Sequence, residues 1–228
     1  ETVETLIERT EAAIEERDVD AEVIHVGSTA RGTWVSGDRD IALFVRFDPD
    51  LEREALERLG LDIGHAVLPD GHTEYAEHPY VKGEVAGFAV DLVPCFAVQK
   101  ATDIQSAVDR TPFHNAYLED RLDEGGAAAV RRFKQFLTGI GVYGSDLRTL
   151  GYSGYIAELL VLEYDGFVSA LEAIREWNPP VRLDPEEHGD RTFDDPLVVI
   201  DPTDPERNVA AVVSEENVAR LVHYARAF

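Results

Sequence analysis

The sequence predicts a mixed α/β (α+β) protein, with a first domain built around a sheet and a second domain that is mainly helical. Three segments carry this expectation. Residues 23–47 hold two apolar strands separated by a Gly-Ser turn, and residues 85–93 form an apolar run typical of a buried strand. Residues 127–139 instead place apolar side chains at helical spacing. We therefore expect domains at residues 1–114 and 115–228.

Helices and strands alternate in the first predicted domain. Apolar spacing predicts helices at residues 2–17 and 50–63, and strands at 21–26, 41–47 and 85–93. Residues 28–34 are expected to form a short helix capped by Ser28. Residues 66–71 and 73–76 are expected to form strand and turn. A hairpin follows, and its turn is expected near Lys82 and Gly83. Residues 109–114 are expected to form a structured loop that ends the domain.

The second predicted domain consists mostly of helices. They are expected at residues 127–139, 152–164 and 166–177, and in a last segment capped by Ser214. The other segments are a Pro- and charge-rich surface loop or hairpin at 179–191, a short strand at 197–200 and a turn at 201–205. The sequence contains no internal repeat that would suggest a solenoid.

Composition and charge restrict the environment. No run of 18 apolar residues exists, the acidic N-terminal segment lacks the features of a signal peptide, and Cys95 is the single cysteine, which together predict a cytoplasmic protein. The net charge of −24 argues against a nucleic-acid partner if it is taken alone. Dispersed acidic residues with only three lysines instead favour a halophilic source, where about 1 M salt shortens the Debye length to about 3 Å. In that case the charge does not exclude RNA.

The strand–turn–strand segment has the layout of a nucleotidyltransferase active site. The Gly27-Ser28 turn offers backbone N–H groups to a triphosphate, and Asp40 stands at the entrance of the following strand. This chemistry needs two carboxylates at alternate positions of one strand, because positions i and i+2 share a face and can reach the same metal ions. The second expected position is Ala42, which lacks a carboxylate.

Asp91 is the second candidate ligand. A carboxylate inside an apolar strand is costly to bury unless it is paired or bound to a metal. A divalent-metal site shared with Asp40 is the favoured interpretation, and an ion pair between Asp91 and an arginine is the alternative. Asp38 follows Gly37 and is expected to be a turn residue rather than a ligand.

A series of motifs resembles the archaeal (class I) CCA-adding tRNA nucleotidyltransferases. The motifs cover nearly the whole chain in order: GSTARGTW at 27–34, Gly37 with Asp40-Ile41 and Phe44, EHPY at 77–80, VDLVPC at 90–95, VDRTPFH at 108–114, Lys134 with GVYG at 141–144, Gly154-Tyr155, and RNVAA at 207–211. The Gly-Ser turn would suit any member of the DNA-polymerase-beta-like superfamily, whereas VDRTPFH and RNVAA are much narrower.

The resemblance implies an activity and a set of roles. The activity is template-independent addition of C, C and A to the tRNA 3′ end from CTP and ATP, with two Mg²⁺ ions. Asp40, position 42 and Asp91 match the metal-binding carboxylates of the family. The resemblance also implies nucleotide-binding roles: contact with the triphosphate for Ser28, Arg31, His114, Lys134 and Tyr143, base reading for Arg207, and a place near the pocket for Glu77 and His78.

Simpler structural roles compete with these assignments. Lys134 could be a solvated charge on a helix, Tyr143 could fill the domain junction, and His114 could cap the next helix. Arg207 could brace the turn at 201–205, and Trp34 is expected to pack in the core rather than to contact a ligand.

The chain departs from the family in two ways. A methyl group at Ala42 cannot ligate a cation, so we expect catalysis to be impaired. Family members also carry a further C-terminal half that holds the tRNA, so we expect nucleotide binding with weak tRNA binding, and a possible homodimer only in the full-length protein. Two alternatives stay open: another template-independent polymerase of poly(A) or oligoadenylate type, and a non-catalytic nucleotide- or RNA-binding pseudo-enzyme for which Ala42 is the natural state.

Overall fold

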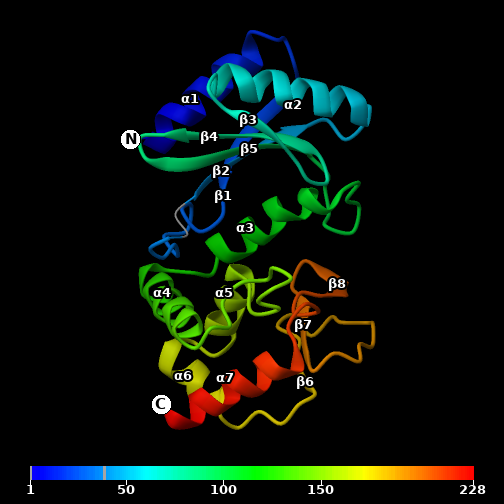
Figure 1. Ribbon diagram of the computed structural model, residues 1–228. Coiled ribbons are helices and arrows are strands. Elements are labelled where there is room, and N and C mark those ends of the chain that lie inside the picture. Colours follow the sequence, from blue (N-terminus) through cyan, green and yellow to red (C-terminus); the bar gives the residue numbers. More distant parts are fainter. Residues whose placement is uncertain (1, 38–39) are drawn as a thin grey trace. The chain divides into compact units, whose positions relative to one another are not determined.

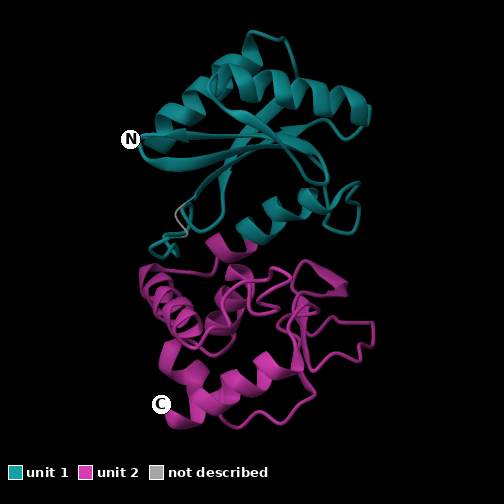
Figure 2. Ribbon diagram, viewed as in Figure 1, with its two compact units in different colours: residues 1–116 teal, residues 117–228 magenta. Residues whose placement is uncertain are grey.

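The computed structural model describes residues 2–37 and 40–228, and Figure 1 shows the order of their helices and strands. The chain divides into two units, Glu1–Ala116 and Tyr117–Phe228 (Figure 2), where the sequence predicts a division after residue 114. Asp38, predicted to be a turn residue, lies outside the described residues. Among the helices that the structure describes, none combines the length and the apolar character needed to cross a bilayer.

A five-stranded sheet forms the centre of the first unit. Its strands are β1 (Ala21–Val26), β2 (Asp40–Phe47), β3 (His72–Tyr75), β4 (Pro79–Val85) and β5 (Phe88–Phe96), in the order β1-β2-β5-β4-β3. Only β2 and β5 pair in parallel, and the other neighbours are antiparallel. The mixed α/β fold predicted from the sequence is confirmed.

Two helices cover one face of this sheet and leave the opposite face uncovered. Helices α1 (Thr2–Glu15) and α2 (Arg53–Val67) lie on the same side in Figure 1 and pack on Ile41, Leu43 and Leu92 in one apolar core. Because successive side chains of a strand alternate between faces, Asp40, Ala42 and Asp91 belong to the opposite face. Ala42 indeed packs with a separate small cluster that includes Phe44 and Val93.

The close approach of α2 to the sheet depends on glycines. A Cβ atom at Gly60 would lie 2.6 Å from Cβ of Pro94, and one at Gly64 would lie 2.5 Å from Cγ2 of Val81. Both distances are shorter than real Cβ contacts, so glycine is required at these positions for the helix to sit where it does.

The hairpin between β4 and β5 turns four residues later than predicted. The strand continues through Lys82 and Gly83, and Val85 pairs with Phe88, which leaves Ala86 and Gly87 as a two-residue loop. Both loop residues have positive φ, 54° and 80°, as a type I′ turn requires. The predicted turn at Lys82-Gly83 is wrong because this later turn has the twist that suits a two-residue hairpin.

Other local predictions for the first unit need correction. Residues 28–32 form turns rather than a helix, so Ser28 is not a helix cap, and α2 occupies residues 66 and 67, which were expected in a strand. The expected loop at 109–114 is helical, with a 3₁₀ turn η1 (Ala107–Arg110) leading into α3 (Thr111–Glu119). Asp109 is fully buried there and accepts backbone hydrogen bonds from Phe96, Gln105 and Ser106 at 2.7–2.9 Å.

The second unit is mainly helical, as predicted. Its helices are α4 (Glu124–Gly139), α5 (Gly154–Glu163), α6 (Phe167–Ile174) and α7 (Glu215–Ala227), and a small sheet contains β6 (Val181–Leu183), β7 (Leu197–Asp201) and β8 (Asp204–Asn208). Asp123, Ser153 and Ser214 cap α4, α5 and α7 by accepting backbone N–H bonds. Strand β8 begins inside the segment expected to be a turn, and β6 lies inside the expected loop or hairpin at 179–191.

Candidate active site

Hydrogen bonds within the first unit hold the turn between β1 and β2 in place. Gly27, with φ of 85°, donates its N–H to Oδ1 of Asn115 at 3.2 Å, and Arg31 Nη1 donates to the same oxygen. Thr29 Oγ1 donates to the backbone oxygen of Asp40 at 2.9 Å. The turn is therefore tied both to α3 and to the entrance of β2. Asn115, which sequence reasoning did not select, already takes the Gly27 N–H that was expected to face a triphosphate.

The two candidate carboxylates lie on neighbouring parallel strands. Asp40 is the exposed first residue of β2, and Ala42 pairs in register with Asp91 on β5. All three belong to the face of the sheet that α1 and α2 leave uncovered. The structure thus places Asp40 and Asp91 on the same face of two paired strands, with the methyl group of Ala42 directly opposite Asp91.

Lys82 is the partner of Asp91. Its Nζ lies 3.2 Å from Oδ1 of Asp91, and the two residues are register partners on β4 and β5. Burial lowers the pKa of Lys82, but the negative charge of Asp91 beside it outweighs burial, so the pKa is raised above its ordinary value. The alternative, an ion pair between Asp91 and an arginine, is wrong because the partner is a lysine. Counting back from a turn at Ala86-Gly87 would have identified Lys82, but that turn was not predicted.

The donor set does not match a two-ion site. Among residues 2–37 and 40–228, no group of three or more His, Cys, Asp or Glu side chains could hold a metal ion. Divalent cations such as Mg²⁺ take oxygen ligands, and two ions in one site usually share carboxylates. Asp40 and Asp91 can contribute to one cation, but Ala42 contributes nothing and Lys82 already pairs with Asp91.

His78 and Glu77 lie next to α2. The His78 side chain is 1% exposed, its Nδ1 is 3.3 Å from Oε1 of Glu57, and its ring packs edge-on against Phe96. Glu77 pairs with Arg53 at 3.8 Å. Since Phe96 belongs to the core under α1 and α2, His78 lies on the helix-covered side of the sheet, whereas Asp40 and Asp91 belong to the opposite face.

Two further predicted residues of the first unit can be placed. His114 lies within α3, directly before Asn115, so it is not a cap of that helix. Trp34 is partly exposed and is not part of a buried core cluster, so the expected core packing is wrong. Arg31, by contrast, is positioned at the turn by its bond to Asn115.

Lys134 and Tyr143 meet at the start of α5 in the second unit. A Cβ atom on Gly154 would lie 3.2 Å from Nζ of Lys134 and 3.3 Å from Oη of Tyr143. Lys134 is 1% exposed and pairs with the equally buried Glu158 at 3.6 Å. The alternative of a solvated lysine is therefore wrong. Sequence reasoning did not select Glu158, although its position one helical turn after Gly154 on an otherwise apolar helix was a usable signal.

Arg207 is held by a buried aspartate. Its Nη1 donates to Oδ2 of Asp201 at 2.7 Å, while Oδ1 of Asp201 accepts from the hydroxyl and backbone N–H of Thr203. Asp201 is fully buried and Arg207 is 36% exposed. The contact agrees with the expected bracing of the turn, and it leaves part of the guanidinium accessible.

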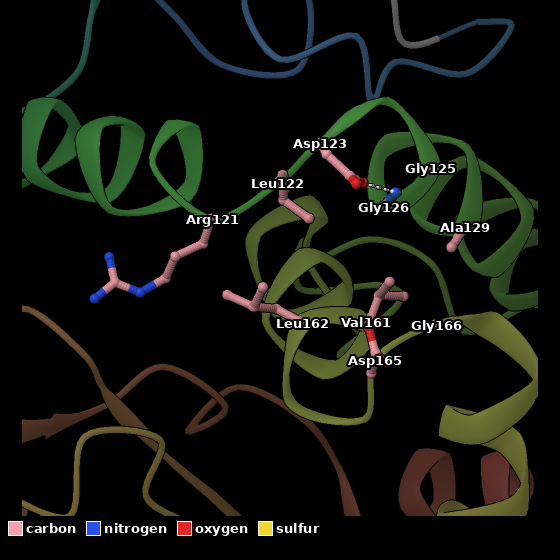
Figure 3. Close-up of a pocket in the computed structure, with 10 residues that line it drawn as sticks. All are labelled: Arg121, Leu122, Asp123, Gly125, Gly126, Ala129, Val161, Leu162, Asp165 and Gly166. Atoms are coloured by element: carbon pink, nitrogen blue, oxygen red, sulfur yellow. Dashed lines mark hydrogen bonds between the residues drawn. The ribbon is translucent and has the colours of Figure 1, made fainter.

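A pocket of about 340 Å³ lies elsewhere in the second unit (Figure 3). Residues at the start of α4 and the end of α5 line it: Arg121, Leu122, Asp123, Gly125, Gly126, Ala129, Val161, Leu162, Asp165 and Gly166. None of these is a predicted site residue. The side chain of Asp123 in this pocket caps α4 through the N–H of Gly126.

Comparisons with known proteins assign the two parts of the chain. The family model "Nucleotidyltransferase domain" matches residues 7–114, and the model "tRNA nucleotidyltransferase, second domain" matches residues 128–228. The CCA-adding enzyme of Haloarcula marismortui is 70% identical over 216 residues, covering 95% of this chain and 46% of the relative. That of Halobacterium salinarum is 67% identical over 223 residues, covering 98% of this chain and 49% of the relative. The chain spans about half the length of the curated relatives it matches.

Solved structures share the fold at low identity. A structure of Cid1, titled for its RNA terminal uridylyl transferase activity, has a TM-score of 0.71 at 15% identity and covers 99% of this chain and 85% of its own. CdnC of E. coli MS115-1 has a TM-score of 0.68 at 18% identity, covering 98% and 80%. The two family models and the curated relatives, together with this fold, define a nucleotidyltransferase. Within that class, the chain belongs to the family of archaeal CCA-adding tRNA nucleotidyltransferases.

Proposed function

We propose that this chain is the nucleotide-binding and nucleotidyl-transfer part of an enzyme that adds C, C and A to the 3′ end of tRNA from CTP and ATP. The observation that carries the proposal is the 70% identity to a CCA-adding enzyme over 95% of the chain. The placement of Asp40 and Asp91 on paired strands supports it, because nucleotidyl transfer needs carboxylates on one sheet face.

We propose roles for the candidate residues of each unit by itself. In the first unit, Ser28, Arg31 and His114 would contact the triphosphate. Glu77 and His78, which were expected near the pocket, lie beside α2 and would affect nucleotide binding only indirectly. In the second unit, Lys134 and Tyr143 would also bind phosphate, because their polar ends meet at Gly154, while the accessible guanidinium of Arg207 would read the base.

Mg²⁺ is the proposed cofactor of the reaction, and Asp40 and Asp91 are its proposed ligands. The residues present do not fit two ions, because position 42 carries a methyl group and Asp91 is paired with Lys82. We therefore propose that this sequence binds nucleotides but transfers them slowly. Ala42 equally favours the second candidate function, a non-catalytic nucleotide- or RNA-binding protein.

The remaining proposals concern the partners and the cell. The relatives are about twice as long as this chain, and we propose that tight tRNA binding and homodimer formation depend on the length that this chain does not span. The net charge of −24 and the halobacterial relatives support a high-salt cytoplasm as its environment.

Restoring the carboxylate tests this function. Ala42→Asp is compared with the unchanged chain for incorporation of labelled CMP and AMP into tRNA lacking CCA, in concentrated KCl with Mg²⁺. We expect the variant to be faster by about a thousandfold, since metal-ion stabilisation contributes several kcal/mol to such reactions. The matched control is Asp91→Asn in the Ala42→Asp background, which should return the rate to its starting value.

The other outcomes select between the candidates. Equal rates for the unchanged chain and Ala42→Asp would show that position 42 is not a metal ligand. Incorporation of AMP alone, in runs, would indicate a poly(A)-type enzyme. Binding of CTP and ATP without transfer by either form would favour the pseudo-enzyme.

A further inference from the structure

Asp91 has two lateral neighbours in the sheet, one uncharged and one positively charged. On β2 its register partner is Ala42, whose side chain is an uncharged methyl group. On β4 its register partner is Lys82, whose Nζ lies 3.2 Å from Oδ1 of Asp91. The three side chains form one row across the uncovered face of the sheet. A cation is therefore already present next to Asp91, supplied by the chain itself.

The position of Lys82 is set by the backbone. The two-residue turn at Ala86-Gly87 determines the register of β4 and β5, so Lys82 and Asp91 are directly opposite each other. Directly opposed opposite charges attract across a sheet. The Lys82 side chain is 34% exposed and that of Asp91 is 23% exposed, so water only partly screens the pair.

The charge of Lys82 reaches both candidate carboxylates. Its ion-pair partner is Oδ1 of Asp91 at 3.2 Å, and the charge of Asp40 also contributes to keeping Lys82 protonated. Near a protein surface, unit charges about 4 Å apart interact more strongly than in bulk water, because the local effective dielectric constant is lower. A divalent cation that approaches Asp40 and Asp91 is repelled by this ammonium and competes with it for the same oxygen.

We propose that Lys82 is a built-in counter-cation that competes with divalent metal ions for Asp91 and thereby sets the metal affinity of the site. This inference rests on the proposed function, because it takes Asp40 and Asp91 as the metal ligands. Divalent binding displaces the ammonium from Asp91. With Ala42 in place, the competition favours Lys82, since the carboxylate pair offers a divalent ion one fewer negative charge than a site with an aspartate at this position.

Binding of Mn²⁺ to the intact 228-residue chain tests the proposal without any assay of catalysis. Free Mn²⁺ is measured by its electron paramagnetic resonance signal during titration of the unchanged chain, Lys82→Gln, Lys82→Arg and Lys100→Gln. We expect Lys82→Gln to tighten binding on the order of tenfold, as loss of a partly screened nearby charge permits. Lys82→Arg keeps the charge and should leave the affinity close to its starting value.

Lys100→Gln is the matched control, because Lys100 is exposed in the loop after β5 and the substitution makes the same change in net charge. An equal effect of Lys82→Gln and Lys100→Gln would overturn the proposal in favour of a general charge effect. The proposal is also overturned if Lys82→Gln still tightens Mn²⁺ binding in an Asp91→Asn background, because the carboxylate for which Lys82 and the metal ion compete is then absent.

The titrations also separate this inference from the proposed function. If Asp91→Asn abolishes Mn²⁺ binding but Lys82→Gln leaves the affinity unchanged, only the role of Lys82 is overturned. Absence of Mn²⁺ binding in Lys82→Gln as well would overturn both the counter-cation and the assignment of Asp40 and Asp91 as ligands. Far-UV circular dichroism of each variant, recorded before titration, is expected to match the unchanged chain.

Discussion

Lys134 of α4 and Glu158 of α5 form an ion pair inside the second unit, with Nζ and Oε1 3.6 Å apart and each side chain only 1% exposed. Burying a charged pair costs several kcal/mol per ion unless the partners and other hydrogen bonds replace the lost water. Such a pair is weak evidence of a contribution to stability. It is better understood here as the means by which the end of Lys134 is kept at the start of α5, beside Tyr143.

Removing the carboxylate while keeping the lysine should be strongly destabilising. We expect Glu158→Gln to lower the free energy of unfolding by about 3–5 kcal/mol, because Lys134 loses its buried counter-charge. Urea titration followed by circular dichroism measures this loss. The double variant Lys134→Met, Glu158→Leu is the control and should recover much of the stability while it loses ATP binding. Full stability of Glu158→Gln alone would contradict the buried pair.

Asp201 is expected to act through Arg207. In Asp201→Asn the charge-assisted bond to the guanidinium is lost, and the exposed part of Arg207 is no longer held in one orientation. If Arg207 reads the base, the affinities for CTP and ATP should fall about tenfold, and the preference for them over GTP should weaken. Equilibrium binding of the three nucleotides checks this.

The control for Asp201→Asn is Thr203→Val, which removes a hydroxyl bond to the same carboxylate but leaves the Arg207 contact in place. It should retain the nucleotide preference. A loss of thermal stability in Asp201→Asn without any change in nucleotide preference would show that Arg207 only braces the turn.

Cys95 should be inert in the folded chain. Burial, followed by the charge of Asp109, raises the pKa of its thiol to about 12, and the side chain is fully buried. At pH 8 we expect iodoacetamide to alkylate Cys95 on the order of a hundredfold more slowly in the native chain than in urea, because reaction requires opening of the first unit. Equal rates would contradict the burial.

The same thiol predicts the direction of a pH effect. An unfolded thiol ionises near pH 9, whereas the folded one stays protonated until about pH 12, so unfolding releases a proton between these values. The unfolded state then binds fewer protons, and the free energy of unfolding must fall as the pH rises through this window. Cys95→Ser should reduce this decline when urea titrations at pH 8 and pH 10 are compared.

Two glycines should respond oppositely to alanine. Gly64→Ala places a methyl group against Val81 and is expected to cost about 1–3 kcal/mol of unfolding free energy, since the packed sheet cannot move away. Gly139→Ala, at the end of α4, meets no atom within 4 Å and should be neutral or stabilising by up to about 1 kcal/mol. Urea midpoints of the two variants give the comparison, and a tolerated Gly64→Ala would mean that α2 lies farther from the sheet.

Much of the site was accessible to sequence reasoning because it depends on local patterns. Period-two spacing places Asp40 and position 42 on one strand face, and the apolar run around Asp91 predicts its strand. Motifs in order along the chain predict the family. The local geometry of the Gly27-Ser28 turn was less accessible: a capped helix was expected, whereas Asn115, 88 residues later in the chain, accepts the Gly27 N–H.

The sequence by itself determined the class of chemistry, the absent carboxylate at Ala42 and the mixed α/β architecture. All three follow from residue type and short-range spacing, which need no knowledge of distant contacts. Only the tertiary structure decided which side chains are partners: Lys82 with Asp91, Glu158 with Lys134, and His78 with Glu57 on the helix-covered side of the sheet. The physical reason is that strand register and helix packing bring together residues far apart in the chain, and a shift of one residue would turn each strand side chain to the opposite face.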